Sequence, residues 1–340
     1  MLSDKQMLYL ANQFVNDYIE AEGQLFDLIA NDLKGYNDDD INDDWYMGKV
    51  LKMGALISIA NSVIKSMPSS SYNNAIKNSF FANLRKKYQD TVNIPKVDKT
   101  ILRNVKTNAL EAFRQGYLDV LNQAYSSVIS GTSTYDIEIK KAITQLVDKG
   151  FTGATYVRKD GSIVNMSLEA VARRDILTTM HQNANDHSLN ACKQLGTNYV
   201  EVSSHPNARP DHALWQGKLY MLEGSTSKYQ NFYEATKYGS VDGLGGVNCK
   251  HRFYPYVLGD KRAFDTYDLK ENEKLYKLEQ QQRANERAIR KWKQKANAVD
   301  TLGQDNTFYK NKVREWQKRN SDFVKEHGLT RDYTREFIIL

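Results

Sequence analysis

The chain has 340 residues, of which 41% are hydrophobic, and its formal net charge at pH 7 is +6. This composition excludes a disordered chain, and the length predicts two or three folding units. Two cysteines cannot build a disulfide framework. No apolar run approaches the ~20 residues that cross a bilayer, and the N-terminus lacks the pattern of a signal peptide. A protein kept in a cytoplasm, without a membrane partner, is therefore expected.

The charge is unevenly distributed along the chain. Residues 1–50 hold eleven acidic and three basic residues, a balance of −8, whereas residues 271–340 hold sixteen basic and eleven acidic residues, a balance of +5. A basic end can lie against nucleic acid. The alternative is a solvated helix of mixed charge, since acids are interleaved throughout.

The N-terminal half predicts helices only, from apolar residues at helical spacing and from residues that stop helices. An acidic loop, Tyr36–Asp44, is expected between the first two helices, with Asp44 as the cap of the second. A linker is expected at Asn93–Lys96. The expected helices are residues 1–34 (one helix or two), Trp45–Met67, Tyr72–Tyr88, Lys99–Ser130 and Thr134–Lys149.

After Phe151 the pattern changes. Residues 154–166 predict two strands around an Asp160-Gly161 hairpin turn, followed by a helix capped by Ser167 and stopped by Gly196. A buried strand is expected at Asn198–Ser203. A turn-rich segment follows, and charged helices are expected at residues 268–295 and 308–327.

The predicted fold class is α+β and mostly α. Three regions follow one another: a helical N-terminal region at residues 1–150, a small α+β domain with a β-hairpin and turn-rich loops at residues 151–265, and a basic helical C-terminal extension at residues 266–340.

The turn-rich segment, Glu201–Gly259, holds three of the six histidines and one of the two cysteines. It contains SSHPNARPDHALWQGKLY and later GLGGVNCKHRFYPYVLG. These motifs resemble the signature of the phage minor capsid protein 2 family, which is related more distantly to the head-morphogenesis proteins of Mu-like phages. The resemblance covers roughly Tyr117–Lys295. Gly245 stands where a further cysteine would be expected, so that position offers no metal ligand.

The resemblance implies a minor structural protein of a tailed-phage or prophage head. Such a protein would act in capsid assembly near the portal, in the host cytoplasm and then in the virion. Its partners would be portal or capsid proteins, with packaged double-stranded DNA as a further contact. The helical N-terminal region at residues 1–150, with its acidic first fifty residues, would be the portal-binding or capsid-binding region, and no enzymatic activity is expected.

Four side chains of the signature segment could hold zinc: His205, His212, Cys249 and His251. Imidazole and thiolate are the ligands that zinc prefers, and four of them close a structural site. Side chains two apart on an extended segment face the same way, which suits Cys249 and His251. The plainer alternative is that the histidines bind loop carbonyls while the cysteine packs as a small apolar group. A catalytic use of a Cys–His pair is a third reading.

Other residues of the signature are expected to shape the loops. Arg209 and Asp211 form an internal ion pair or anchor loop carbonyls, and Trp215 fills the core. Glycines permit tight turns. The residues assigned this structural role are Arg209, Asp211, Trp215, Gly217, Gly246 and Asn248. Because both halves of the segment lead into apolar anchors, we expect residues 205–217 to fold against residues 246–251.

A short basic face is predicted on the helix at residues 274–295, where Arg283, Arg287 and Arg290 recur at helical spacing beside Lys291. These four could contact DNA phosphates, although cations at a helix C-terminus also suit the helix dipole without any ligand. Two rival functions follow from the site and from this face: a nuclease or toxin-like enzyme, and a stand-alone DNA-binding protein.

Overall fold

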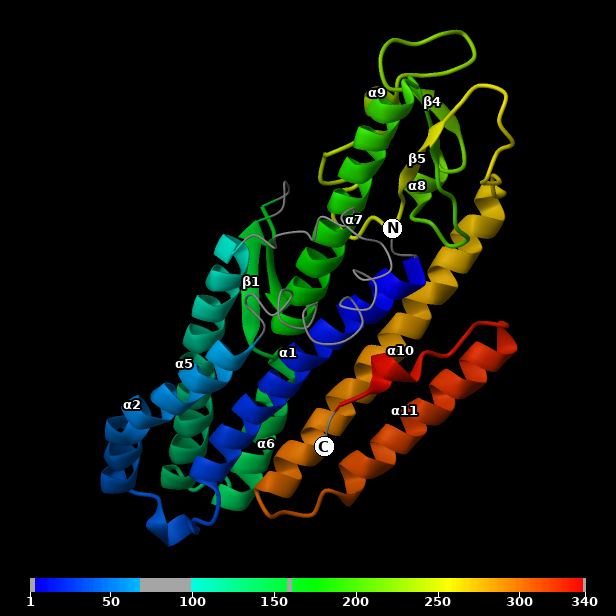
Figure 1. The fold of residues 1–340 in the computed structure, drawn as a ribbon. Helices are drawn as coiled ribbons and strands as arrows, with labels where there is room; N and C mark the ends of the chain where they lie inside the picture. Colours follow the sequence, from blue (N-terminus) through cyan, green and yellow to red (C-terminus); the bar gives the residue numbers. More distant parts are fainter. Residues whose placement is uncertain (1–3, 68–98, 158–160, 339–340) are drawn as a thin grey trace, which may run out of the picture. The chain divides into compact units, whose positions relative to one another are not determined.

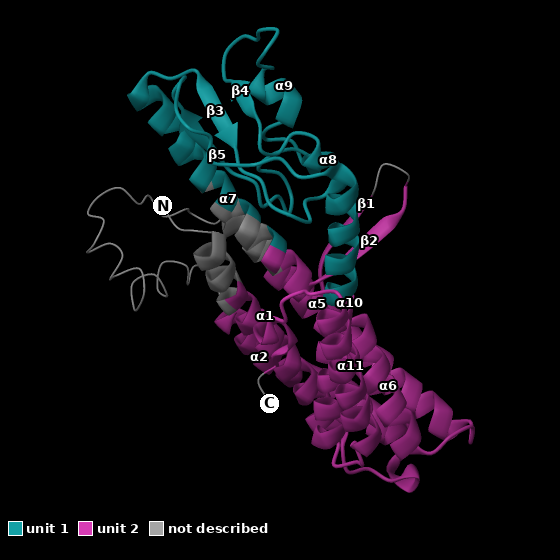
Figure 2. Cartoon of the chain, turned by 90° about the vertical axis from the view of Figure 1, so that its right-hand side faces the viewer, with its two compact units in different colours: residues 1–11, 78–97, 174–283 teal, residues 12–77, 98–173, 284–340 magenta. Residues whose placement is uncertain are grey.

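The computed structural model describes residues 4–67, 99–157 and 161–338. Over these residues the fold is α+β and mostly helical, as the sequence predicts, with long helices and two small antiparallel sheets (Figure 1). The chain divides into two compact units (Figure 2). Unit 1 includes Arg174–Arg283, and unit 2 includes residues 12–67, 99–173 and 284–338. The units combine separated segments, so the division of the chain at residues 150 and 265 stays a prediction.

The predicted helices of the N-terminal half are confirmed where the structure describes them. The first is one continuous helix, not two. The expected helix Tyr72–Tyr88 and the linker Asn93–Lys96 lie outside the described residues. The observed elements are α1 (Asp4–Leu33), the short 3-10 helix η1 (Asp38–Asp40), α2 (Asp43–Ser66), α5 (Lys99–Ile129) and α6 (Tyr135–Lys149).

The cap of α2 differs from the prediction. Asn42 precedes the helix, and its side chain accepts a hydrogen bond from the backbone N–H of Trp45 at 2.9 Å. Asp44 lies inside the first turn. The helix starts two residues earlier than expected because an asparagine caps as well as an aspartate, and the two aspartates that follow it suit the positive end of the dipole.

A buried polar cluster ties three helices of unit 2 together. Asp32 on α1 accepts hydrogen bonds from Lys49 on α2 at 3.0 Å and from the Tyr117 hydroxyl on α5 at 2.8 Å. The Lys49 ammonium, 7% exposed, also donates to the Asp32 carbonyl. A buried charge is tolerated when it is paired and hydrogen-bonded, so this cluster fixes the register of the three helices.

Helix α2 has a large exposed apolar side. Among the described helices, α2 is the one whose length and composition would allow it to cross a membrane, and only 17% of that stretch is buried. Length and composition alone are weak evidence of a membrane span. On its other side α2 contacts α5, where Tyr46 donates to Asn122 at 2.7 Å and Lys106 donates to the carbonyl of Lys65 at 3.1 Å.

The two predicted strands and the helix after them are present, while Asp160 of the expected turn lies outside the described residues. Strands β1 (Thr152–Val157) and β2 (Ile163–Ser167) pair antiparallel. Helix α7 (Leu168–Leu195) follows at once, and the Ser167 hydroxyl accepts from the backbone N–H of Ala170 at 3.3 Å. The predicted cap is therefore confirmed. Helix α7 contributes its first residues to unit 2 and the rest to unit 1.

Unit 1 is built around a three-stranded antiparallel sheet in the order β4-β3-β5. The predicted strand is the central one, β3 (Tyr199–Val202), flanked by β4 (Leu219–Met221) and β5 (Phe253–Tyr256). The core against the sheet combines Val200 and Val202 with Cys192 of α7 and with Phe232 of the short helix α9 (Phe232–Thr236). Its aromatic and aliphatic side chains explain why this small sheet is stable.

The signature segment carries more regular structure than expected. Besides β4, β5 and α9 it contains a one-turn helix, α8 (Pro210–Ala213). Strand β5 was missed because Pro255 argues against a strand. Pro255 lies opposite Val200, but β5 is an edge strand, where a missing N–H costs no ladder hydrogen bond.

The C-terminal helices match the prediction. Helix α10 (Leu269–Thr301) extends a turn and a half beyond the expected end, and α11 is Thr307–Glu326. Within unit 2 the second part of α10 runs beside α11 (Figure 1). Buried Asn285 donates to buried Asn320 at 3.4 Å between them, and a short 3-10 helix, η2 (Tyr333–Glu336), adds Glu336 to the same polar cluster.

A buried acid in α1 makes unit 2 sensitive to pH. Glu22 is 6% exposed, and its carboxylate accepts the backbone N–H of Phe151 at 3.0 Å. Burial raises the pKa of Glu22 from 4.5 to about 7, against the opposing effect of that hydrogen bond. Between these two values the unfolded state loses its proton while the folded state keeps it. The free energy of unfolding therefore falls as pH rises from about 4.5 to about 7.

Replacing Glu22 with Gln should remove this loss of stability. The amide oxygen can still accept the Phe151 N–H, but no proton is lost at any pH. A rise in pKa from 4.5 to about 7 corresponds to roughly 3 kcal/mol. Denaturant unfolding should show Glu22→Gln more stable than the wild type at pH 8, by up to that amount, and nearly equal to it at pH 4. The same pH dependence in both proteins would contradict the assignment.

Candidate functional site

The site forms where the chain leaves β3 and where it enters β5. The backbone N–H of Ser203 donates to the Arg252 carbonyl at 2.8 Å, and the backbone N–H of Arg252 donates to the Ser203 hydroxyl at 2.9 Å. These bonds extend the strand pairing by one step. They place the residues around His205 beside those around His251, as the sequence predicts.

Helix α8 presents His212. Pro210 occupies its first turn, where a proline is favoured because its missing N–H has no partner in any case. Arg209 pairs with Asp211 at 2.9 Å, which confirms the predicted ion pair. Arg209 also donates to the carbonyl of Asp242 at 2.8 Å. This bond links helix α8 to the glycine-rich loop, which contains Gly243, Gly245 and Gly246.

The glycine-rich loop passes too close to itself for side chains. A Cβ atom on Gly243 would lie 1.9 Å from the Lys237 carbonyl oxygen, and one on Gly246 would lie 2.3 Å from that of Ser240. Only glycine fits at such distances. The fold of this loop aims the Asp242 carbonyl at His212 and leads directly into Cys249.

Gln216 joins the two halves of the site, and sequence analysis missed it. Its Oε1 lies 3.0 Å from the backbone nitrogen of His205 and 3.0 Å from Nε2 of His251. A backbone N–H can only donate, so the atom that faces it is the amide oxygen. His251 must then carry its proton on Nε2, which leaves Nδ1 with an open lone pair. No sequence signal distinguishes this glutamine from any other.

Three of the four predicted ligands come together. The ligand atoms of His212, Cys249 and His251 all lie within 4.8 Å of one another. The Cys249 sulfur is 3.8 Å from Nδ1 of His251. All three side chains are buried, at 2%, 2% and 1% exposure. Among the residues that the structure describes, this is the group of His, Cys and acidic side chains arranged closely enough to share one metal ion.

The fourth predicted ligand, His205, lies outside this group. Its ring stacks on that of His251, with 4.4 Å between the centroids. Its Nδ1 donates to the carbonyl of Pro206 at 2.9 Å, and a carbonyl can only accept. His205 therefore packs on one side of the His251 ring. The Trp215 ring also packs against it, with 4.7 Å between the ring centroids.

Burial keeps the site neutral. Burial lowers the pKa of His251. Burial also lowers the pKa of His212, and the charge of Arg209 adds to this effect, while the hydrogen bond to the Asp242 backbone opposes it. Burial raises the pKa of the Cys249 thiol. A nucleophilic cysteine needs the opposite shift, because the thiolate is the reactive form. In this structure the Cys249–His251 pair is therefore buried and neutral.

The remaining signature residues take structural positions. Trp215 is buried in the unit 1 core, as predicted. A Cβ atom on Gly217 would lie 2.4 Å from the carbonyl of Asp265, and Asn248 has a left-handed backbone with φ of 57°. Asparagine tolerates that conformation better than most residues.

The basic residues of α10 differ in their surroundings. Arg283 pairs with Glu279 in unit 1. In unit 2, Arg290 is 7% exposed and pairs with Glu169 at 2.7 Å, while Lys291 donates to the Asp148 carbonyl at 2.6 Å. A buried, paired guanidinium has no open side for a phosphate, so Arg290 does not extend the basic face as expected. DNA contact by Arg283, Arg287 and Lys291 stays a prediction.

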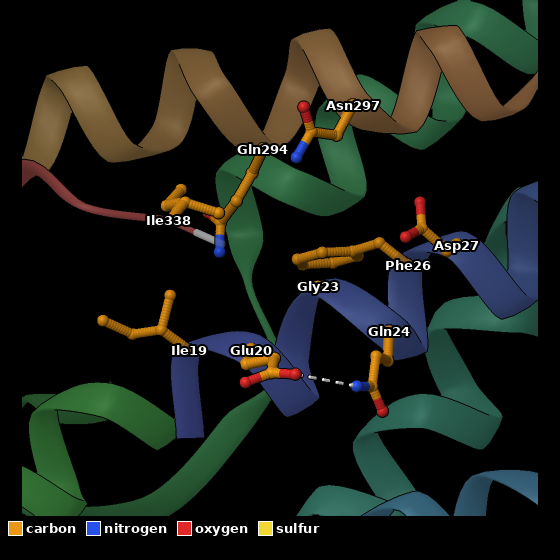
Figure 3. A pocket seen from close by; sticks show the side chains of 9 residues that line it. All are labelled: Ile19, Glu20, Gly23, Gln24, Phe26, Asp27, Gln294, Asn297 and Ile338. Carbon is orange, nitrogen blue, oxygen red and sulfur yellow. Dashed lines mark hydrogen bonds between the residues drawn. The ribbon is translucent and has the colours of Figure 1, made fainter. Parts of the chain in front are cut away.

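Unit 2 has a cavity of about 210 Å³ that belongs to a different part of the chain (Figure 3). Its wall is formed by α1 and α10, with Glu20 hydrogen-bonded to Gln24 at 3.4 Å and with Asp27, Gln294 and Asn297 around it. Carboxylates and amides share this wall with Ile19, Phe26 and Ile338, and neither histidine nor cysteine takes part in it.

Comparison with known proteins identifies the family of this chain. The family described as phage minor capsid protein 2 matches residues 95–325, which include the whole signature segment. A structural protein of Lactococcus phage LL-H is 33% identical over 229 residues, which cover 65% of this chain and 61% of that protein. A structural protein of Lactococcus phage mv4 is 37% identical over 115 residues, 33% of this chain and 93% of that protein. No solved structure matches.

The chain therefore belongs to the phage minor capsid protein 2 family, as the signature predicted. It is a phage structural protein. The match spans 61% of the LL-H protein's length, so the particular partners and the step of assembly are matters for proposal.

The glycine loop offers a direct test of this geometry. Gly246→Ala places a methyl group on the Ser240 carbonyl and should destabilise unit 1 by about 1–3 kcal/mol, the usual cost of overpacking. Gly48→Ala is the control, because nothing lies within 4 Å of that position in α2 and alanine favours helix by up to ~1 kcal/mol. Thermal unfolding should separate the two variants. Equal stability of Gly246→Ala and wild type would contradict the loop geometry.

Proposed function

We propose that this protein acts in head assembly next to the portal, as a minor component of the virion that carries out no chemical turnover. The observation that carries this proposal is the family match over residues 95–325. The burial of Cys249 and His251, which are 2% and 1% exposed, supports the absence of turnover, because buried structural cysteines are inert. Head assembly would take place in the host cytoplasm, before the protein is enclosed in the virion.

We assign the contact with the portal to the exposed side of α2. Met47, Leu51 and Ile59 are 52%, 79% and 52% exposed and recur at helical spacing. Contiguous exposed apolar surface commonly marks a protein interface. Asp43 and Asp44 in the first turn of this helix, after the acidic residues Asp38–Asp40, favour a partner with basic residues near that end. In a head-assembly protein, the portal is the partner that fits this role.

Helix α1 is less suited to that role. Val15, Tyr18 and Leu25 on this helix are fully buried. Deleting residues 1–44 would therefore expose the core of unit 2, and failure of the deleted protein to enter heads would not identify a binding surface. Single substitutions on α2 are the sharper experiment.

Leu51→Asp should weaken co-elution with the portal protein at least about tenfold, equivalent to ~1.4 kcal/mol, and should reduce incorporation into heads. Ile137→Asp is the matched control, because Ile137 is 60% exposed on α6 of the same unit. Binding to the portal that is unchanged in Leu51→Asp would refute this surface. Loss of binding to the major capsid protein instead of the portal would refute the choice of partner.

The rival enzymatic function has its own test. Incubation of the purified protein with DNA, RNA or nucleotides and Mg²⁺ or Zn²⁺ should leave all of them intact. Cleavage that disappears in His212→Ala or His251→Ala would identify a nuclease at the site and overturn the structural assignment. Salt-dependent binding to free DNA would favour the DNA-binding alternative.

A further inference from the structure

We propose that His212, Cys249 and His251 bind one zinc ion in unit 1, each supplying one ligand atom. The ion would join helix α8 to the segment that enters β5. This inference does not depend on the role in head assembly, because it rests on side chains within one compact unit.

The distances suit zinc. Bonds of ~2.0–2.3 Å at tetrahedral angles place neighbouring ligand atoms roughly 3.3–3.8 Å apart. The Cys249 sulfur and Nδ1 of His251 are already 3.8 Å apart, and no pair in the group exceeds 4.8 Å. Binding would therefore require the side chains to close by up to about 1.5 Å, which rotamer adjustment can supply.

The protons are also placed correctly at His251. Gln216 Oε1 receives the Nε2–H of this ring, so the lone pair of Nδ1 points to the side of the ring where Cys249 lies. Metal-bound histidines commonly donate their other N–H to an oxygen that fixes the ring. Gln216 has that role here.

His212 has a comparable oxygen partner. Its Nε2 lies 2.9 Å from the Asp242 carbonyl and 2.6 Å from a guanidinium nitrogen of Arg209. One nitrogen cannot donate to the carbonyl and accept from Arg209 at once. Zinc on Nδ1 would select the form in which Nε2–H donates to Asp242, leaving Arg209 its own bond to that carbonyl at 2.8 Å.

Cys249 would bind as the thiolate. Its S–H proton would pass to solvent when the sulfur–zinc bond forms, as for other cysteine ligands. Without zinc, the thiol has a weak hydrogen bond to His251 at 3.8 Å. With zinc, two loops separated by more than thirty residues in the chain would be linked through one ion.

The test uses the full chain, expressed with zinc, desalted and analysed for bound metal. We expect one zinc per chain. Replacement by Co²⁺ should give the strong visible bands of a tetrahedral site and a thiolate-to-cobalt charge-transfer band in the near ultraviolet. Chelation should lower the melting temperature. A wild-type protein that folds but holds far less than one zinc, or whose cobalt form lacks the thiolate band, would overturn the proposal.

Variants then identify the ligands. Cys249→Ser and His212→Gln should each weaken the affinity for zinc. The loss should exceed the roughly 10–100-fold that is typical when a residue that only hydrogen-bonds to a metal ligand is changed. Cys192→Ser is the matched control, because it alters the other buried cysteine of the same core. His205→Phe keeps a ring against His251 without a ligand nitrogen and should retain zinc.

Folding of each variant is checked by circular dichroism, so that lost zinc is not confused with lost structure. Equal zinc retention in the folded ligand variants would overturn the site. Loss of zinc in folded Cys192→Ser or His205→Phe would overturn this set of three ligands.

Discussion

The geometry of the signature segment depends on one acceptor, the side-chain oxygen of Gln216. It accepts the backbone N–H of His205 from one half of the segment and the Nε2–H of His251 from the other, both at 3.0 Å. Each bond buries a polar group that would otherwise cost free energy without a partner. Because the same oxygen also sets the tautomer of His251, it determines which nitrogen faces Cys249. The orientation of the His251 ring depends on this oxygen, while the bonds between Ser203 and Arg252 set the course of the chain into β5.

Unit 2 differs in that buried charge pairs join its helices beside an apolar core that includes Phe26 and Phe151. Lys49 with Asp32 and Arg290 with Glu169 are pairs whose members would be costly to bury alone. Glu22 is the exception, since burial raises its pKa to about 7 and its main partner is a backbone N–H. A structural protein that must enter an assembly benefits from fixed helix registers, and such polar pairs specify register more strictly than apolar contacts do.

Much of the fold could be predicted from the sequence because it depends on local signals. Helices that end at Gly131 and Gly150 and the Ser167 cap were found from single residues and helical periodicity. Strand β5 was missed because its Pro255 is tolerated only on an edge, and strand order is a property of the whole sheet. The cluster of His212, Cys249 and His251 was predicted from residue chemistry. The separation of His205 from it, the role of Gln216 and the burial of Arg290 depend on long-range packing that no spacing reveals.

The central claim, that Gln216 couples the two halves of the segment, can be measured with a double-mutant cycle in metal-free protein. The variants are Gln216→Leu, His251→Phe and the combination of both, compared by the free energy of unfolding. Since the two side chains share a buried hydrogen bond, the account predicts a coupling energy of about 1–3 kcal/mol. Effects of the two substitutions that add to within ~0.5 kcal/mol would contradict it.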